Sequence, residues 1–173
     1  MCHTVETAID GYRIRTATSD DTALILDFIR KLAAYERLLS EVVATEAVLH
    51  ESLFVKKQAE VIIGEHEGRP VAFALYTQNF STFLGKGNLY LEDLYVDEHV
   101  RGRGFGKAML ICLAKIAVSR GCERLDWCCL NWNEPSIAFY KQLGAVPMSD
   151  WTTFRLAGKA LVDVSKGLCA ANA

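Results

Sequence analysis

The feature that most constrains the fold is a change of hydrophobic period between residues 89 and 130. Residues 89–96 are a mostly apolar run of strand length, and residues 104–120 are apolar almost all round over the length of a helix. Gly102 and Gly104 lie between these two runs, where they permit a tight turn. A second strand-like run follows at 124–130, so the sequence predicts a parallel strand–helix–strand unit.

The other segments predict an antiparallel half of a sheet with helices around it. Glu67-Gly68-Arg69-Pro70 joins two strand-like runs and is typical of a hairpin turn. The run Ser19-Asp20-Asp21 and Thr45 stand where helix caps are expected. Together these elements predict a mixed α/β (α+β) fold. We expect strands at 13–15, 60–65, 71–78, 89–96, 124–130 and 151–156, and helices at 19–38, 46–53, 104–120 and 135–143.

Length and charge limit the classes of function. The chain has 173 residues, about one domain, and we expect a single domain over residues 1–173 with its core at about 12–156 and short tails. Its formal charge of −2 disfavours nonspecific binding to duplex nucleic acid, which needs a basic excess. No apolar stretch approaches the ~20 residues that cross a bilayer, and the N-terminal residues lack the pattern of a signal peptide. We therefore expect a cytoplasmic protein without nucleic-acid or membrane partners.

The cysteines and histidines do not have the spacing of a metal site. No C-x-x-C pair occurs, and the four histidines are isolated in the sequence. We expect no metal, and we interpret the cysteines as reduced residues that mostly serve as small core side chains. The six cysteines are at positions 2, 112, 122, 128, 129 and 169.

The turn at 101–107 has the chemistry of an anion site. Its glycines expose main-chain N–H groups, the following helix adds free N–H donors, and Arg101, Arg103 and Lys107 favour a pyrophosphate. It is not a Walker A loop, because Arg101 stands where that loop needs glycine and Ala108 stands where it needs a hydroxyl. Lys107 also replaces the third glycine of the dinucleotide-binding pattern. The pattern that remains is R-x-x-G-x-G, and the alternative is a turn that only connects strand and helix.

Two carboxylates interrupt the apolar strand at 89–96. Glu92 and Asp93 would be costly to bury unless they are paired, hydrogen-bonded or used in chemistry. The alternative is a β-bulge that turns one of the two acids to solvent. Tyr140 lies in the helix expected at 135–143, where by itself an aromatic side chain is more often structural than catalytic.

Four segments resemble one enzyme superfamily. The R-x-x-G-x-G turn is similar to the pyrophosphate loop of the GNAT superfamily of acetyl-CoA-dependent N-acetyltransferases, and residues 133–140 are similar to its second cofactor segment. The closer resemblance, over about residues 12–156, is to the diamine (spermidine/spermine) and thialysine acetyltransferases. It implies a GNAT-like mixed, mostly antiparallel sheet with a parallel strand–helix–strand unit and flanking helices, acetyl-CoA as cosubstrate, and a homodimer. The segments are Leu-Ala-Ala-Tyr-Glu at 32–36, Leu-Tyr-Leu-Glu-Asp at 89–93, Arg-Gly-Arg-Gly-Phe-Gly at 101–106 and Trp-Asn-Glu-Pro-Ser-Ile-Ala-Phe-Tyr-Lys at 132–141.

The resemblance also implies which residues form the site. The main chain of 94–96 would pair with the pantetheine arm, the turn at 101–107 would hold the pyrophosphate, and Tyr140 would stand beside the sulfur. The implied cofactor-binding residues are Leu94, Tyr95, Val96, Arg101, Gly102, Arg103, Gly104, Phe105, Gly106, Lys107, Asn133, Glu134, Pro135, Ser136 and Tyr140. The implied acceptor-binding residues are Tyr35, Glu36, Glu92, Asp93, Asp126, Trp127 and Cys128.

Acetyl transfer to an amine defines two catalytic roles. A protonated aliphatic amine must lose a proton before it can attack a thioester, and Glu92, which we expect its strand to desolvate, is the best candidate base. Tyr140 can give its phenolic proton to the leaving thiolate. Direct attack in a ternary complex needs no enzyme nucleophile, although an acyl-enzyme on Cys128 or Cys129 is the minority alternative.

The acceptor is less defined than the reaction. Polyamine enzymes usually carry an acid near Ser81 and a tryptophan near Phe83, and the acidic stretch near Asp150 is shortened here. These departures favour a diamine or a thialysine-like acceptor over spermine. Two alternatives stay open: an enzyme of the same fold with another acceptor, such as an amino acid or a protein amine, and a catalytically silent acyl-CoA-binding module.

Overall fold

The computed structural model describes residues 4–167, and the chain forms two compact units, residues 1–130 and 131–173. Cys2, His3 and Cys169, which the metal prediction considered, lie outside the described residues. Within residues 4–167, no helix is long and apolar enough to cross a membrane.

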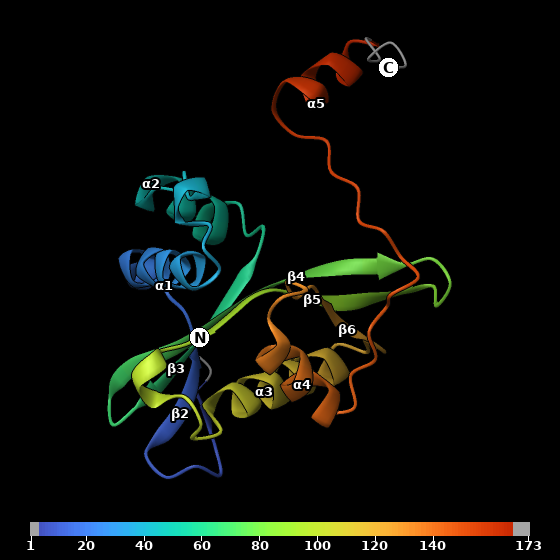
Figure 1. Ribbon diagram of the computed structural model, residues 1–173. Coiled ribbons are helices and arrows are strands. Elements are labelled where there is room, and N and C mark those ends of the chain that lie inside the picture. Colours follow the sequence, from blue (N-terminus) through green and yellow to red (C-terminus); the bar gives the residue numbers. More distant parts are fainter. Residues whose placement is uncertain (1–3, 168–173) are drawn as a thin grey trace. The chain divides into compact units, whose positions relative to one another are not determined.

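The first unit is built on a six-stranded sheet whose strands follow one another in chain order (Figure 1). Neighbouring strands are antiparallel except the last pair, which is parallel. This is the mostly antiparallel mixed sheet that the sequence predicts. The strands are β1 (Thr4–Glu6), β2 (Tyr12–Thr16), β3 (Glu60–His66), β4 (Arg69–Ser81), β5 (Lys86–Val96) and β6 (Leu125–Trp127).

Helices cover both faces of this sheet (Figure 1). On one face, α1 packs Ile25 and Phe28 against Ile63, Phe73 and Tyr95 of the central strands, and this cluster is the main core. On the other face, Phe105 at the start of α3 stacks on Tyr12, with ring centroids 4.1 Å apart. The helices of this unit are η1 (Ser19–Asp21), α1 (Thr22–Tyr35), η2 (Leu39–Glu41), α2 (Glu46–His50), the π-helical η3 (Glu51–Val55), η4 (Glu98–Val100) and α3 (Phe105–Ser119).

The first helix ends three residues before its predicted end, and this places two candidate site residues. Arg37 has a left-handed φ of 64°, and the N–H of Leu38 donates to the carbonyl of Ala33 (2.8 Å). This turn closes α1 at Tyr35, so Tyr35 and Glu36 lie at the tip of the helix. The beginning of the predicted helix is the short helix η1, whose N-cap is Thr18, and α1 itself begins at Thr22 with Asp21, from the predicted capping run, as its N-cap.

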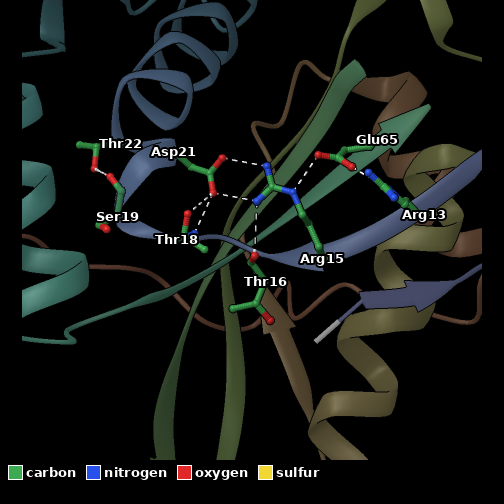
Figure 2. Close-up of polar contacts among 8 residues, drawn as sticks. All are labelled: Arg13, Arg15, Thr16, Thr18, Ser19, Asp21, Thr22 and Glu65. Atoms are coloured by element: carbon green, nitrogen blue, oxygen red, sulfur yellow. Dashed lines mark hydrogen bonds and ion pairs between the residues drawn. The ribbon is translucent and has the colours of Figure 1, made fainter. Parts of the chain in front are cut away.

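A buried ionic network holds the start of α1 to strands β2 and β3 (Figure 2). Arg15 makes a two-point contact with Asp21 (2.7 and 2.8 Å) and also donates to Glu65 (2.7 Å). Arg13 donates to the other oxygen of Glu65 (2.8 Å), and Asp21 accepts from the main chain of Thr18 (2.7 Å). Nothing in the hydrophobic pattern indicated this network, because it depends on strand register.

The second unit contains α4 (Glu134–Gln142) and α5 (Gly158–Ser165). The prediction of a strand at 151–156 is wrong, because these residues are not assigned to a helix or strand in the described chain. The sequence predicts tails outside residues 12–156, whereas the structure has the strand β1 and the helix α5 there. The strand predicted at 124–130 is also shorter, since β6 ends at Trp127.

Candidate active site

The last five residues of strand β5, 92–96, have an open edge. Strand β6 pairs only with the segment from Leu89 to Leu91, whereas β5 continues to Val96. Within residues 4–167, no strand pairs with the β6-facing edge of residues 92–96. An unpaired edge presents main-chain N–H and C=O groups to a ligand, and Leu94–Val96 are the residues that the resemblance assigns to the pantetheine arm.

A β-bulge lies at the beginning of this open edge. Leu91 pairs with Tyr76 and Asp93 pairs with Leu75, so Glu92 is the extra residue on β5. Glu92 is exposed and Asp93 is half-buried. The expectation that the strand desolvates Glu92 is therefore wrong. The bulge turns Glu92 outward and leaves Asp93 as the more buried acid of the pair.

Two other carboxylates, Glu92 and Glu36, act on Asp93 at this bulge. Burial raises the pKa of Asp93 to about 6, and the negative charges of Glu92 and Glu36 contribute to the rise. Burial also raises the pKa of Glu36, at the tip of α1. The charges of Glu36 and Glu92 therefore both reach Asp93, whereas the assignment of these acids to the acceptor stays a prediction.

The neighbouring strand adds polar side chains to this region. In the register of β5 and β6, Tyr90 is opposite Asp126 and Leu91 is opposite Trp127. The hydroxyl of Tyr90 donates to the sulfur of Cys128 (3.2 Å), and this bond is the main reason that the pKa of Tyr90 is raised. Asp126 forms an ion pair with Arg124 (3.3 Å). Asp126 therefore has a cationic partner. Tyr90 was not among the site residues that the sequence predicts.

The turn after β5 has the backbone geometry of an anion site. Gly102 and Gly104 have φ angles of 80° and 87°, a region in which residues with a side chain are strained. Helix α3 starts directly after Gly104, so the first N–H groups of the helix have no intrahelical acceptor. Arg103 and Lys107 are exposed beside them. Free N–H donors, a helix N-terminus and two cations fit a pyrophosphate.

Arg101 is held by the protein itself. Its Nε donates to the carbonyl of Val96 (2.9 Å). Its guanidinium carbon lies 4.6 Å from the ring centroid of Tyr35 and 5.4 Å from that of Tyr95. The side chain that the sequence assigns to the pyrophosphate is thus folded back over the end of β5.

In the second unit, Asn133 caps helix α4. Its side-chain oxygen accepts from the N–H of Ser136 (3.4 Å), and Pro135 occupies the first turn. Glu134 is exposed, and the ring of Tyr140 lies 5.4 Å from that of Phe139. The N-terminus of α4 therefore carries the four residues predicted to flank the cofactor, and Tyr140 lies in the second turn.

Comparison with known proteins identifies the fold and the reaction class. Residues 27–145 match the acetyltransferase (GNAT) family, well over half of the chain. The chain belongs to the GNAT acetyltransferase family. It is an N-acetyltransferase by family, and GNAT enzymes use acetyl-CoA. The family resemblance, the enzyme class and the mixed-sheet fold expected from the sequence are confirmed.

Individual relatives resemble nearly the whole chain. The chain is 35% identical over 164 residues to thialysine N-epsilon-acetyltransferase from Bos taurus, covering 88% of this chain and 96% of that protein. It is 30% identical to L-ornithine N5-acetyltransferase from Arabidopsis thaliana, over 93% and 92% of the two chains. An integron cassette protein from V. cholerae has the same fold, with a TM-score of 0.76, 26% identity and 90% and 98% coverage.

The described residues show no cluster for a metal. Among residues 4–167, no group of three or more His, Cys, Asp or Glu side chains could hold a metal ion. The four described cysteines, at 112, 122, 128 and 129, are free thiols.

Proposed function

We propose that the protein transfers an acetyl group from acetyl-CoA to the terminal primary amine of a small cationic acceptor, by direct attack in a ternary complex. One observation carries this proposal. The charges of Glu36 and Glu92 act on Asp93 at a bulge that begins the open edge of β5, and the short helix η4 and then the glycine turn follow that edge along the chain. A group of acids followed by an anion-binding turn suits a cationic acceptor and a phosphorylated donor.

The chain's own residues divide into those that would bind acetyl-CoA and those that would bind the amine. The main-chain N–H groups at the start of α3, with Arg103 and Lys107, would bind the pyrophosphate. The open edge at 94–96 would bind the pantetheine arm, with Asn133–Ser136 as a second contact segment. When bound, acetyl-CoA supplies an acetyl thioester as the acyl donor.

The acids at the bulge would prepare the acceptor. An alkylammonium group must give up a proton before it becomes a nucleophile. Glu92 would accept this proton, directly or through one water. Asp93 would support Glu92, because a carboxylate with a pKa of about 6 exchanges protons near neutral pH. Tyr140 would deliver its phenolic proton to the departing sulfur.

The relatives narrow the class of acceptor. Thialysine and ornithine, the substrates in the names of the two relatives, both carry a primary amine on a short aliphatic chain. Long polyamines fit this protein less well, because the hairpin tip that precedes β5 offers Ser81, which is buried, and exposed Phe83 rather than acids. We therefore favour a diamine or a thialysine-like amino acid over spermine.

A panel of amines tests this proposal. Release of CoA is measured with thialysine, ornithine, a short diamine, spermine and an acceptor without a side-chain amine. We expect the highest kcat/KM for the short primary amines. Preference for spermine, or reaction only with neutral or anionic acceptors, would contradict the proposed pocket, and acetyl-CoA binding without turnover would indicate a silent binding module.

Three further parts of the proposal concern the whole molecule. We propose that the two units serve one acetyltransferase domain, because the family match at 27–145 spans the boundary after residue 130. We propose a homodimer in the cytoplasm, on the resemblance to related enzymes. Light scattering at micromolar concentration tests the dimer, and a mass equal to one chain would refute it.

A further inference from the structure

The contacts of Arg101 suggest a role for Tyr35 that the sequence did not indicate. Tyr35 is the last residue of α1, and Tyr95 is the residue before the last of β5. The guanidinium of Arg101 lies 4.6 Å from one ring centroid and 5.4 Å from the other. Both distances are within the range of a cation–π interaction.

The two rings differ in how firmly they are fixed. Tyr95 belongs to the buried core, where it packs against Phe28 with ring centroids 6.1 Å apart. Tyr35 is half-buried at the tip of the helix. Arg101 also donates to the carbonyl of Val96 (2.9 Å), so its side chain connects the glycine turn to the end of β5 and to the end of α1.

We propose that Tyr35 is a positioning residue for the acetyl-CoA turn: its ring holds Arg101, and Arg101 holds the turn at 101–107 against the end of β5. This inference rests on the proposed function, in which that turn binds the pyrophosphate. The N–H groups that face a phosphate must be held in place before binding, because a mobile turn has to be ordered at the expense of affinity. Tyr35 then acts on the donor and not on the acceptor.

The adjacent residue serves the other substrate. Glu36 acts on Asp93 in the acid cluster and does not contact Arg101 in the described interactions. The tip of α1 thus carries one residue for each half of the site. Replacing Tyr35 and Glu36 separately should therefore change different constants.

The first measurement is hydrogen exchange of the turn in the ligand-free protein. Tyr35→Leu removes the aromatic face, and we expect the amides of Val100 and Arg101, which donate to the carbonyls of Asp97 and Glu98, to exchange about two to five times faster than in the parent. That range corresponds to about 0.5–1 kcal/mol at 1.4 kcal/mol per tenfold change, which is the size of a cation–π contact at an exposed site such as Arg101. Tyr35→Phe keeps the ring and should exchange like the parent. Unchanged exchange in Tyr35→Leu would overturn the inference.

The second measurement is calorimetric titration with acetyl-CoA in the absence of amine. Tyr35→Leu should raise Kd by about the same factor, and it should have little effect once Arg101 has been replaced by Met. Glu36→Gln should leave Kd unchanged and raise the KM of the acceptor. Leu32→Ala, one turn earlier on α1, controls for loss of stability, since it should lower Tm without changing Kd.

These outcomes separate the inference from the function on which it rests. A higher acceptor KM with unchanged acetyl-CoA Kd in Tyr35→Leu would mean that Tyr35 contacts the acceptor, and would overturn the inference. If the parent bound acetyl-CoA but acetylated no amine, the proposed function would fail while the role of Tyr35 stood. If the parent bound no acetyl-CoA, both the function and the donor half of the inference would fail.

Discussion

Gly104 and Gly106 look equivalent in the R-x-x-G-x-G pattern, but the structure predicts opposite responses to alanine. Gly104 has a φ of 87°, and a Cβ there would lie 3.4 Å from Cδ1 of Ile9. Gly106 lies in helix α3, and a Cβ there would lie 3.7 Å from Cγ2 of Val96, an ordinary contact on the sheet side. The methyl group of alanine at 106 therefore points toward the protein and away from solvent.

The magnitude follows from the backbone. An L-residue with a side chain in the left-handed region costs about 1–2 kcal/mol, and the flexible end of Ile9 can move aside, so the steric contribution is small. Gly104→Ala must either keep this strain or move the N–H groups of the turn. If the strain is relieved by moving the turn, 1–2 kcal/mol corresponds to a rise in acetyl-CoA Kd of about 5–30-fold. Gly106→Ala gains up to about 1 kcal/mol of helix stability.

Calorimetry with acetyl-CoA and thermal unfolding of the parent and both variants measure these effects. We expect Gly104→Ala to bind more weakly or to melt at lower temperature, and Gly106→Ala to bind like the parent with an equal or higher Tm. The reasoning is refuted if Gly104→Ala has the parent's Kd and Tm, or if Gly106→Ala is the weaker binder of the two.

Three further predictions concern charge and proton transfer. Glu92→Gln should lower kcat by about 10²-fold at neutral pH and by less at high pH. It should also shift the acid limb of the pH–rate profile, which Asp93 sets, below pH 6, because one of the charges that raise the pKa of Asp93 is lost. An unshifted acid limb would mean that the two acids are not coupled. Tyr140→Phe should lower kcat with little change in either KM, and an unchanged kcat would remove Tyr140 from the mechanism. Arg15→Met should cost about 3–5 kcal/mol in urea unfolding, because it removes the cation paired with buried Asp21 and one of the two cations paired with buried Glu65. Arg13→Met, at a side chain 51% exposed, should cost about 0–1 kcal/mol, and equal losses would contradict the network in Figure 2.

The same network predicts a pH dependence of stability. The hydrogen bond from Arg15 lowers the pKa of Asp21, and the pKa of Glu65 is also lowered, since the bonds from Arg15 and Arg13 outweigh the opposing effect of burial. Carboxyl groups with a lowered pKa stabilise the fold above their ordinary values of about 4, and this stabilisation is lost as the pH falls through the folded-state pKa values. Unfolding free energies between pH 7 and pH 2 should therefore fall more steeply in the parent than in Arg15→Met.

Local signals in the sequence predicted most of the fold. The hairpin between β3 and β4, the Thr45 cap and the change of period around α3 are each determined by neighbouring residues, and each appears in the structure. The prediction of a strand at 151–156 is wrong because alternating apolar residues form a strand only when a partner strand is available, and periodicity does not show whether one is. The predicted end of α1 is wrong because Arg37 adopts a left-handed conformation that its residue type does not favour.

The candidate site was predicted less completely than the fold. The sequence indicated the acids at 92 and 93 and raised a bulge as an alternative, but only the pairing of β4 with β5 shows that Asp93 is the more buried acid. The resemblance assigned Tyr35 to the acceptor and Arg101 to the pyrophosphate. Their contact joins residues far apart in the chain, so no motif could indicate it.

Transfer of a labelled acetyl group tests the central claim most directly. The protein is mixed with acetyl-CoA carrying a ¹³C-labelled acetyl group and with thialysine or ornithine, and the products are identified by NMR. We predict that the label appears in an amide on the terminal side-chain nitrogen of the amine, with one CoA released for each acetyl group transferred, and that none is found on the protein. A label that stays on CoA with every short primary amine, although calorimetry shows that acetyl-CoA binds, would contradict the account.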